Sequence, residues 1–452
     1  MTGAATVNVG EVIEKARLNP VRVLCVALCA LVALFDGLDL QIIGLAAPSI
    51  AATMQIPVGA LGAVFSVALA GLAVGGLVIA PLADRLGRKA VLVSAVVFFG
   101  VFTLATITAN TVTTLLVYRF LTGLGLGAAV PCAISLASEV VPARRRAAVA
   151  GLLFAGFPLG GVLAGLLGSA LIPTSGWHSL FVVGGIGPLL TAVVLVPVLP
   201  ESLIFLVSRR APHRRVARSM ARVAPDVSVD PSLLVADSRD RTGGAPVRRL
   251  FAADRRLGTA LLWTASFAAF GVLVVNTSWA PTLLAPLGLP VARTALALAL
   301  FNAGSVVATA AGGWLIARYG ARRVLPAAFL LAAIGLVGVG VLAPSASGVA
   351  SAEVLVGLGL GCASSGVIAL AAVAYSTAIR STGVGWALGI GRVGSFVGPL
   401  VVGALAAAAW AVAGVFAVLA AACLVGGGAA AVLRPVRDGG PPSRSPLHEG
   451  AA

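Results

Sequence analysis

Long, uninterrupted apolar runs constrain this chain more than any other feature. A membrane-spanning α-helix needs roughly 20 mostly apolar residues, whereas a membrane β-barrel shows alternating segments of about 10 residues. The runs here are continuous, and 59% of all residues are hydrophobic while only 10% are charged. The sequence therefore predicts an all-α membrane protein with twelve transmembrane helices, at Val21–Ala47, Leu61–Leu82, Ala90–Ala109, Thr113–Ala137, Ala147–Ile172, Leu180–Leu199, Leu257–Trp279, Thr294–Ala317, Val324–Leu342, Ala352–Ala374, Val384–Ala406 and Ala409–Leu433.

Basic residues are concentrated in every second loop between these runs. The loop after the second run contains Arg85, Arg88 and Lys89, whereas the alternate loops contain only Arg293. Loops rich in Arg and Lys stay on the cytoplasmic side of a membrane, so both termini are predicted to be cytoplasmic. The net charge of +16 then follows from topology and predicts contact with the lipid bilayer, not with nucleic acid.

No residue pattern predicts a metal, a cofactor or ATP. The five cysteines all lie in predicted spans and the three histidines lie in loops or the tail, so neither type has metal-ligand spacing. A phosphate-binding GxxxxGK[ST] motif is absent, and the glycines of the fourth span lack the spacing of a dinucleotide-binding motif. The sequence therefore predicts neither an enzyme nor an ATP-driven pump, and any energy for transport comes from an ion gradient.

A long polar segment, residues 200–256, divides the chain into two groups of six spans. Arg119–Gly127 in the fourth span recurs as Glu353–Gly361 in the tenth, and Gly76–Lys89 recurs loosely as Gly313–Arg323 at nearly the same separation. Duplicated halves are typical of transporters whose halves rock about a central site. We predict a cytoplasmic N-terminal segment (1–20), two six-helix bundles (21–199 and 257–433), a cytoplasmic central loop (200–256) and a disordered cytoplasmic tail (434–452).

Charged residues inside predicted spans are costly, by about 2.5–3.5 kcal/mol each on insertion scales. Asp36 and Asp39 share one face of the first helix, and Arg119 lies in the fourth. Helix rise puts Asp36 roughly 21 Å from one membrane face and Arg119 roughly 9 Å from the other, which is the same level in a core of about 30 Å. Arg119 can therefore pair with one carboxylate and leave the other, Asp36 in the first instance, to carry a proton. A purely structural ion pair is the alternative.

Arg392 is isolated in the eleventh predicted span, with no acidic residue in its own helix. Because a guanidinium suits bidentate binding of a carboxylate, we predict that it anchors an organic anion. A pair with Glu353 or Asp39 is the alternative. Trp386, less than two turns earlier, either stacks on an aromatic substrate or anchors the helix at the membrane interface. Neutral substrate contacts from the second half are predicted at two amides, Asn276 and Asn302.

Charged residues at the cytoplasmic helix ends lie outside the hydrocarbon core, so we assign them to gating and not to substrate binding. Asp84, Arg85 and Arg88 connect the second and third spans, while Glu139 and Arg144 follow the fourth.

Several of these segments resemble known transporters. Asp84–Lys89 resembles the signature loop of the major facilitator superfamily, and Arg119–Gly127 is similar to its helix 4 motif. Asp36–Asp39 is similar to the DGxD motif of the aromatic acid:proton symporter family, and Tyr375–Gly394 resembles the helix 10–11 region of the same family.

The resemblance covers nearly the whole chain. It implies the major facilitator fold and a multi-pass protein of the bacterial plasma (inner) membrane. It also implies import of an aromatic carboxylate (benzoate, hydroxybenzoate, protocatechuate, gentisate or phenylpropionate type) with protons, and assigns proton coupling to Asp36, Asp39 and Arg119. Ala80 departs from the signature loop, which normally opens with glycine. Gly156–Gly161 resembles a motif of drug:proton antiporters, so a proton-driven exporter of drugs or small metabolites is the alternative.

Overall fold

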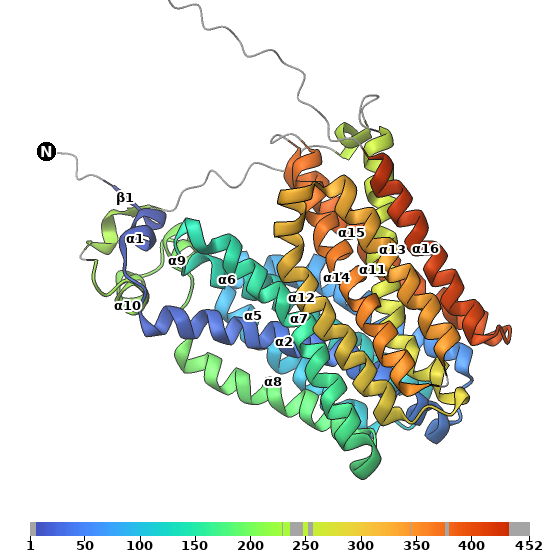
Figure 1. Ribbon diagram of the computed structural model, residues 1–452. Coiled ribbons are helices and arrows are strands. Elements are labelled where there is room, and N and C mark those ends of the chain that lie inside the picture. The colour runs from blue at the N-terminus through green and yellow to red at the C-terminus, as the bar shows by residue number, and fades with distance from the viewer. Residues whose placement is uncertain are drawn as a thin grey trace, which may run out of the picture.

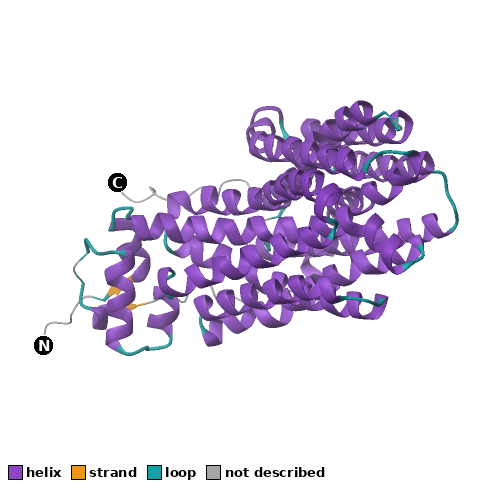
Figure 2. Cartoon of the chain, turned by 90° about the horizontal axis from the view of Figure 1, so that it is seen from below, coloured by secondary structure: helices purple, strands orange, loops and turns teal. Residues whose placement is uncertain are grey.

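The computed structural model describes residues 6–227, 229–235, 247–251, 256–343, 345–375 and 379–433. The chain is almost entirely helical, and its helices form two bundles (Figures 1 and 2). The described residues include 12 helices long and apolar enough to cross a membrane, and each overlaps one predicted span. The predicted tail, residues 434–452, lies outside the described residues.

The first bundle contains the spans before the central loop. Its helices are α2 (Pro20–Met54), α3 (Leu61–Val74), α5 (Arg88–Ala105), α6 (Val112–Glu139), α7 (Ala143–Ser175) and α8 (His178–Val198). The second span continues beyond α3 through a π-helical turn, Gly75–Ile79, then a 3₁₀ turn, Ala80–Leu82, and α4 (Ala83–Leu86). Short π-helical turns are rare and frequently occur at functional sites.

The second bundle repeats this order. Its helices are α11 (Arg256–Leu284), α12 (Val291–Tyr319), α13 (Ala321–Leu342), α14 (Ala346–Ala374), α15 (Arg380–Ala407) and α16 (Val412–Val432). Local sequence determines where helices begin. Asn19 accepts a hydrogen bond from the Arg22 amide (2.9 Å) directly before Pro20, and Ser345 caps α14 in the same way, as expected for N-caps and for proline in a first turn.

A small cap covers one end of the first bundle. It contains α1 (Val9–Lys15), α9 (Leu203–Ser208), α10 (His213–Val223) and two short parallel strands, β1 (Val7–Asn8) and β2 (Leu234–Val235). Arg22, near the start of α2, is fully buried here. Its guanidinium donates to the backbone carbonyls of Val140, Ala16, Arg17 and Ile13, so it fixes the cap to α2 and α6.

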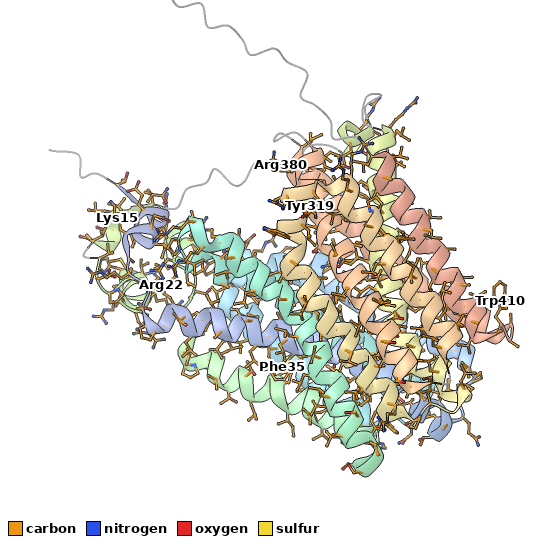
Figure 3. The ribbon with its side chains drawn as sticks, viewed as in Figure 1. Lys15, Arg22, Phe35, Tyr319, Arg380 and Trp410 are labelled. Atoms are coloured by element: carbon orange, nitrogen blue, oxygen red, sulfur yellow. The ribbon has the colours of Figure 1, made fainter. Side chains whose placement is uncertain are left out.

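We call the end that carries this cap, together with Tyr319 and Arg380 of the second bundle, the basic end; Trp410 marks the opposite end (Figure 3). The helices of the two bundles diverge toward the basic end and converge toward the opposite end (Figure 1). There, Phe65 of α3 packs edge-on against Trp279 of α11, with ring centroids 5.4 Å apart. Gly44 lies so close to α11 that a Cβ would come within 2.7 Å of the Thr277 carbonyl oxygen. The bundles are therefore closed against each other at the opposite end.

Candidate functional site

A buried ion pair connects α2 and α6 in the centre of the first bundle. Arg119 Nη1 lies 3.1 Å from Asp39 Oδ2, and both side chains are completely buried. Thr103 donates to the other Asp39 oxygen at 2.6 Å, and Arg119 also donates to Thr106 and Thr122. Because a buried charge is stable only when paired and hydrogen-bonded, these threonines complete the site. Sequence reasoning missed them, since a threonine in a span has no distinctive signal.

Asp36, one turn before Asp39, is the carboxylate without a partner. It is buried, and among the described residues it forms no ion pair and its Oδ1 atom accepts no hydrogen bond. Of the two carboxylates that Arg119 was predicted to reach, its partner is Asp39 and not Asp36. The two carboxylates therefore differ: Asp39 has a cation as its partner, and Asp36 has none among the described residues.

Arg392 extends from α15 of the second bundle toward the first. Its Nη1 atom lies 3.5 Å from the position that a Cβ on Gly76 would occupy, in the π-helical turn of the second span. Its charge interacts electrostatically with Asp36 on α2. Among the described residues Arg392 forms no ion pair, and its side chain is exposed. Neither Glu353 nor Asp39 therefore neutralises it, and its fork of donors is open to a ligand anion.

Trp386 does not share the face of Arg392. Six residues at roughly 100° each place the two side chains about 120° apart around α15. Trp386 stacks on Trp263 of α11, with centroids 5.6 Å apart and ring planes at 17°, and Trp263 meets Phe251 edge-on. This aromatic cluster near the basic end fits an interfacial anchor better than a substrate contact.

Asn276 and Asn302 already have protein partners in this conformation. Asn276 donates to Glu353 at 2.8 Å, within the second bundle. Asn302 and Gln41 donate to each other at 2.8 and 3.0 Å, across the two bundles. Both amides are buried, so neither presents a free group to a substrate here. Gln41 went unnoticed in the sequence, although a glutamine inside an apolar run is a signal for an interhelical hydrogen bond.

The Gln41–Asn302 pair is expected to stabilise the conformation that is closed at the opposite end. Two hydrogen bonds at about 0.5–1.5 kcal/mol each shift a two-state equilibrium by about tenfold when their sum is near 1.4 kcal/mol. Asn302→Ala is therefore expected to move the population away from this conformation by about tenfold. Distances between spin labels on the basic ends of the two bundles would measure the shift. An unchanged distance distribution would show that the pair has no role in closure.

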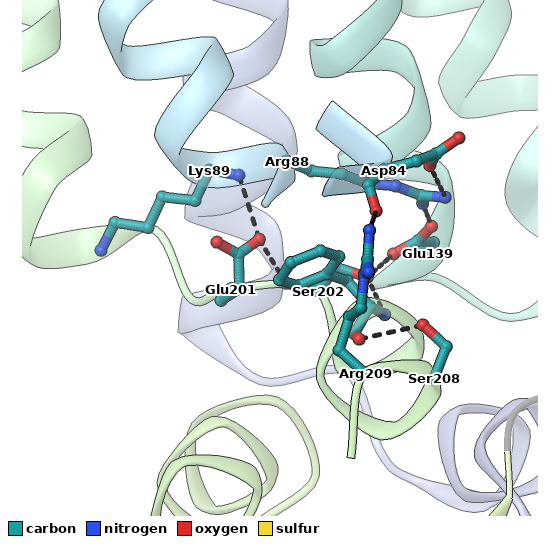
Figure 4. Close-up of polar contacts among 9 residues, drawn as sticks. Asp84, Arg88, Lys89, Glu139, Glu201, Ser202, Ser208 and Arg209 are labelled. Carbon is teal, nitrogen blue, oxygen red and sulfur yellow. Dashed lines mark hydrogen bonds and ion pairs between the residues drawn. The ribbon is translucent and has the colours of Figure 1, made fainter. Parts of the chain in front are cut away.

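A polar cluster at the basic end collects three of the predicted gating residues (Figure 4). Arg88 forms ion pairs with Glu139 and, at 3.8 Å, with Asp84. Glu139 also accepts from Ser202, and the Asp84 carbonyl accepts from Arg209 at 3.0 Å. The two remaining residues, Arg85 and Arg144, are exposed and form no ion pair with a described residue. All these contacts lie within the first bundle and its cap, so the cluster does not bridge the bundles in this conformation.

Asp84→Asn is expected to slow transport and leave substrate affinity nearly unchanged, because the cluster lies outside the central region. Initial uptake rate and equilibrium binding, measured on the same membranes, would separate the two effects. Arg214→Gln is a matched control, since Arg214 is exposed on α10 and belongs to no cluster. Lost affinity with a normal transport rate would contradict the gating assignment.

Comparison with known proteins decides the family. Residues 29–352 and 261–452 match the family model described as Major Facilitator Superfamily. The chain belongs to this superfamily. Solved structures agree on the fold: the D-xylose-proton symporter superposes with a TM-score of 0.71 at 17% identity, covering 91% of this chain and 97% of that one. The predicted fold class, two six-helix repeats, is confirmed.

The relatives in sequence are named as aromatic acid transporters. This chain is 40% identical over 374 residues to the 4-hydroxybenzoate transporter PcaK of Pseudomonas putida, covering 82% of this chain and 84% of the relative. It is 36% identical over 401 residues to a gallate transporter of the same species, covering 89% of each. It is 34% identical over 412 residues to the 3-(3-hydroxy-phenyl)propionate transporter of Escherichia coli, covering 91% and 93%. The resemblance to this group of the superfamily is confirmed.

Proposed function

We propose that this chain imports an aromatic carboxylate together with protons by alternating access. The observation that carries the proposal is the arrangement of Asp36 and Arg392. A carboxylate on the first bundle and a guanidinium on the second, neither of which forms an ion pair with a described residue, lie within electrostatic range of each other. The names of the relatives support an aromatic carboxylate as the substrate class.

Arg392 and Asp36 together explain how anion and proton binding become coupled. A substrate carboxylate on Arg392 would satisfy the cation that otherwise favours the ionised form of Asp36. Protonation of Asp36 then removes a like charge from beside the substrate. Each ligand therefore favours binding of the other, and such coupling is reciprocal by thermodynamic necessity. Asp39 does not share this role, because Arg119 neutralises it.

Coupling to protons also has an electrical reason. An anion that enters a cell with a negative interior works against about 2.3 kcal/mol per charge per 100 mV. One co-transported proton cancels this cost, and a second makes the membrane potential favour entry. An importer of carboxylates therefore gains from a titratable group on the substrate path.

The proposed orientation follows from the charge pattern. Because loops rich in Arg and Lys remain in the cytoplasm, the basic end faces the cytoplasm, and the protein resides in the bacterial inner membrane. The bundles are closed at the opposite end, so this conformation is inward-facing. An outward-facing conformation would then require the Gln41–Asn302 pair to separate.

Radiolabelled uptake tests the proposal. Cells that express the chain would be given benzoate, 4-hydroxybenzoate, protocatechuate, gentisate or phenylpropionate, with and without a protonophore. Accumulation of at least one acid that the protonophore abolishes is the expected result, and cells with the empty vector provide the control. Failure of every acid to accumulate, with the protein present in the membrane, would refute import.

The alternative, proton-driven export, rests on Gly156–Gly161 in α7. In the structure this segment packs closely against α2: a Cβ on Gly160 would clash with the Leu34 carbonyl oxygen. These glycines therefore have a packing role that serves either direction of transport. Protonophore-sensitive depletion of a preloaded compound, without uptake of any aromatic acid, would favour the exporter.

A further inference from the structure

The second bundle contains a buried carboxylate that the proposed transport mechanism does not use. Glu353 of α14 is 1% exposed, and Asn276 of α11 donates to its Oε2 atom at 2.8 Å. Its Oε1 atom is buried and has no hydrogen-bond partner among the described residues. Glu353 therefore differs from Asp39, which has both a cation and a second hydrogen bond.

No charged group among the described residues compensates Glu353. The helices that pack against α14 are α11, α12, α13 and α15. Their described charged residues are all arginines: Arg256 at the start of α11, Arg293 at the start of α12, three more near the connection of α12 and α13, and Arg380 and Arg392 on α15. None forms an ion pair with Glu353, and the group that acts on its carboxyl is the neutral amide of Asn276. An isolated ionised carboxylate in such a place is far less stable than its neutral form.

The hydrogen bonds of Glu353 and Asn276 also favour the neutral form of Glu353, independently of the charges around it. Asn276 Oδ1 is also buried without a partner, so the acid and the amide each have one unsatisfied oxygen. Both oxygens are acceptors, and two acceptors cannot bond unless a proton lies between them. A single proton on Glu353 Oε1, donated to Asn276 Oδ1, would satisfy both and close a reciprocal acid–amide pair. The Gln41–Asn302 amide pair shows the same two-bond arrangement.

We propose that Glu353 is a second proton-binding site, which holds one proton in this conformation and shares it with Asn276. The site lies in the second bundle, whereas Asp36 and Asp39 lie in the first. The internal repeat relates Glu353 to Arg119, at the start of the duplicated segments. In each half, one polar pair joins the first span to the fourth. The ion pair of Asp39 and Arg119 joins α2 to α6, and the proposed protonated acid Glu353 with Asn276 joins α11 to α14. The proposal does not depend on the transported substrate.

Infrared difference spectroscopy of the purified, lipid-reconstituted protein at neutral pH tests the site. A protonated carboxyl has a carbonyl-stretch band that carboxylates lack and that shifts in D₂O. We expect the wild-type protein and Asp36→Asn to show a deuterium-sensitive band of this kind that Glu353→Gln lacks. Glutamine fits the site, because its amide can form the same two hydrogen bonds with Asn276. Glu139→Gln is the matched control, since Glu139 is ion-paired with Arg88 and its removal should leave the band unchanged.

Asn276→Ala gives a second measurement that does not require a folded Glu353 variant. Loss of the donor to Oε2 should move the same band to higher frequency, because its carbonyl loses a hydrogen bond. A spectrum in which Glu353→Gln removes no protonated-carboxyl band, or in which Asn276→Ala leaves that band in place, would overturn the proposal. Neither readout depends on uptake, so transport and this site can fail separately.

Discussion

Asp36→Asn is expected to abolish accumulation of substrate against a gradient while exchange of internal for external substrate continues. A proton that moves down one pH unit supplies about 1.4 kcal/mol, which supports about tenfold accumulation. Without the carboxylate this energy has no route through Asp36 into the cycle, so the variant should exchange substrate without accumulating it. Exchange does not require the empty carrier to reorient and therefore does not require the proton. Proteoliposomes with an imposed pH gradient, assayed beside counterflow, would measure both activities.

Asp39→Asn provides the contrast, because the structure gives the two aspartates different environments. Removing Asp39 leaves Arg119 buried without its counter-ion, and loss of one partner from a buried pair costs about 3–5 kcal/mol. This variant should therefore lose counterflow and thermal stability as well as accumulation. Undiminished gradient-driven accumulation by Asp36→Asn would show that Asp36 does not carry the coupled proton.

Arg392→Ala is expected to weaken equilibrium binding of substrate by at least about 30-fold. Truncating one member of a hydrogen-bonded charge pair costs about 2–5 kcal/mol, and 2 kcal/mol corresponds to about 30-fold in affinity. Arg392→Lys should lie between the alanine variant and the wild type, because lysine retains the charge but not the planar fork of donors. Binding of a radiolabelled aromatic acid to purified protein would give these affinities directly, without a contribution from transport rate.

Arg380→Ala is the matched control for this prediction. Arg380 lies on the same helix but at its exposed first residue, so its loss should leave substrate affinity unchanged. Wild-type affinity in Arg392→Ala, with the protein correctly inserted, would end the assignment of Arg392 as the anion anchor.

Much of the fold follows from hydropathy alone, because a bilayer requires each crossing segment to satisfy its own backbone hydrogen bonds. Long apolar runs must therefore be helices, and all twelve are. The ends were predicted less well. The first helix continues to Met54, seven residues beyond the predicted Ala47. The cap formed by α1, α9 and α10 was predicted only as polar segments.

The residues of the candidate site were likewise predicted only in part. Asp36, Asp39, Arg119 and Arg392 were evident from the sequence, because a charge inside a span is costly and therefore conspicuous. Asn276 and Asn302 were predicted as substrate contacts, and Trp386 as a substrate contact or an interfacial anchor. In this conformation they contact Glu353, Gln41 and Trp263. A polar or aromatic residue in a span has no property that separates a ligand contact from a contact with another helix.

The sequence by itself determined how many helices cross the membrane, which loops share a side and how deep each charge lies, since these depend on composition and on the rise of a helix. Only the tertiary structure decided which groups meet. Asp36 and Asp39 differ in depth by about 4.5 Å, which is less than the reach of an arginine side chain, so depth could not assign the partner of Arg119. The rotation and neighbours of each helix make that assignment. Side-chain packing between helices determines both the rotation and the neighbours of a helix, and hydropathy contains no information about this packing.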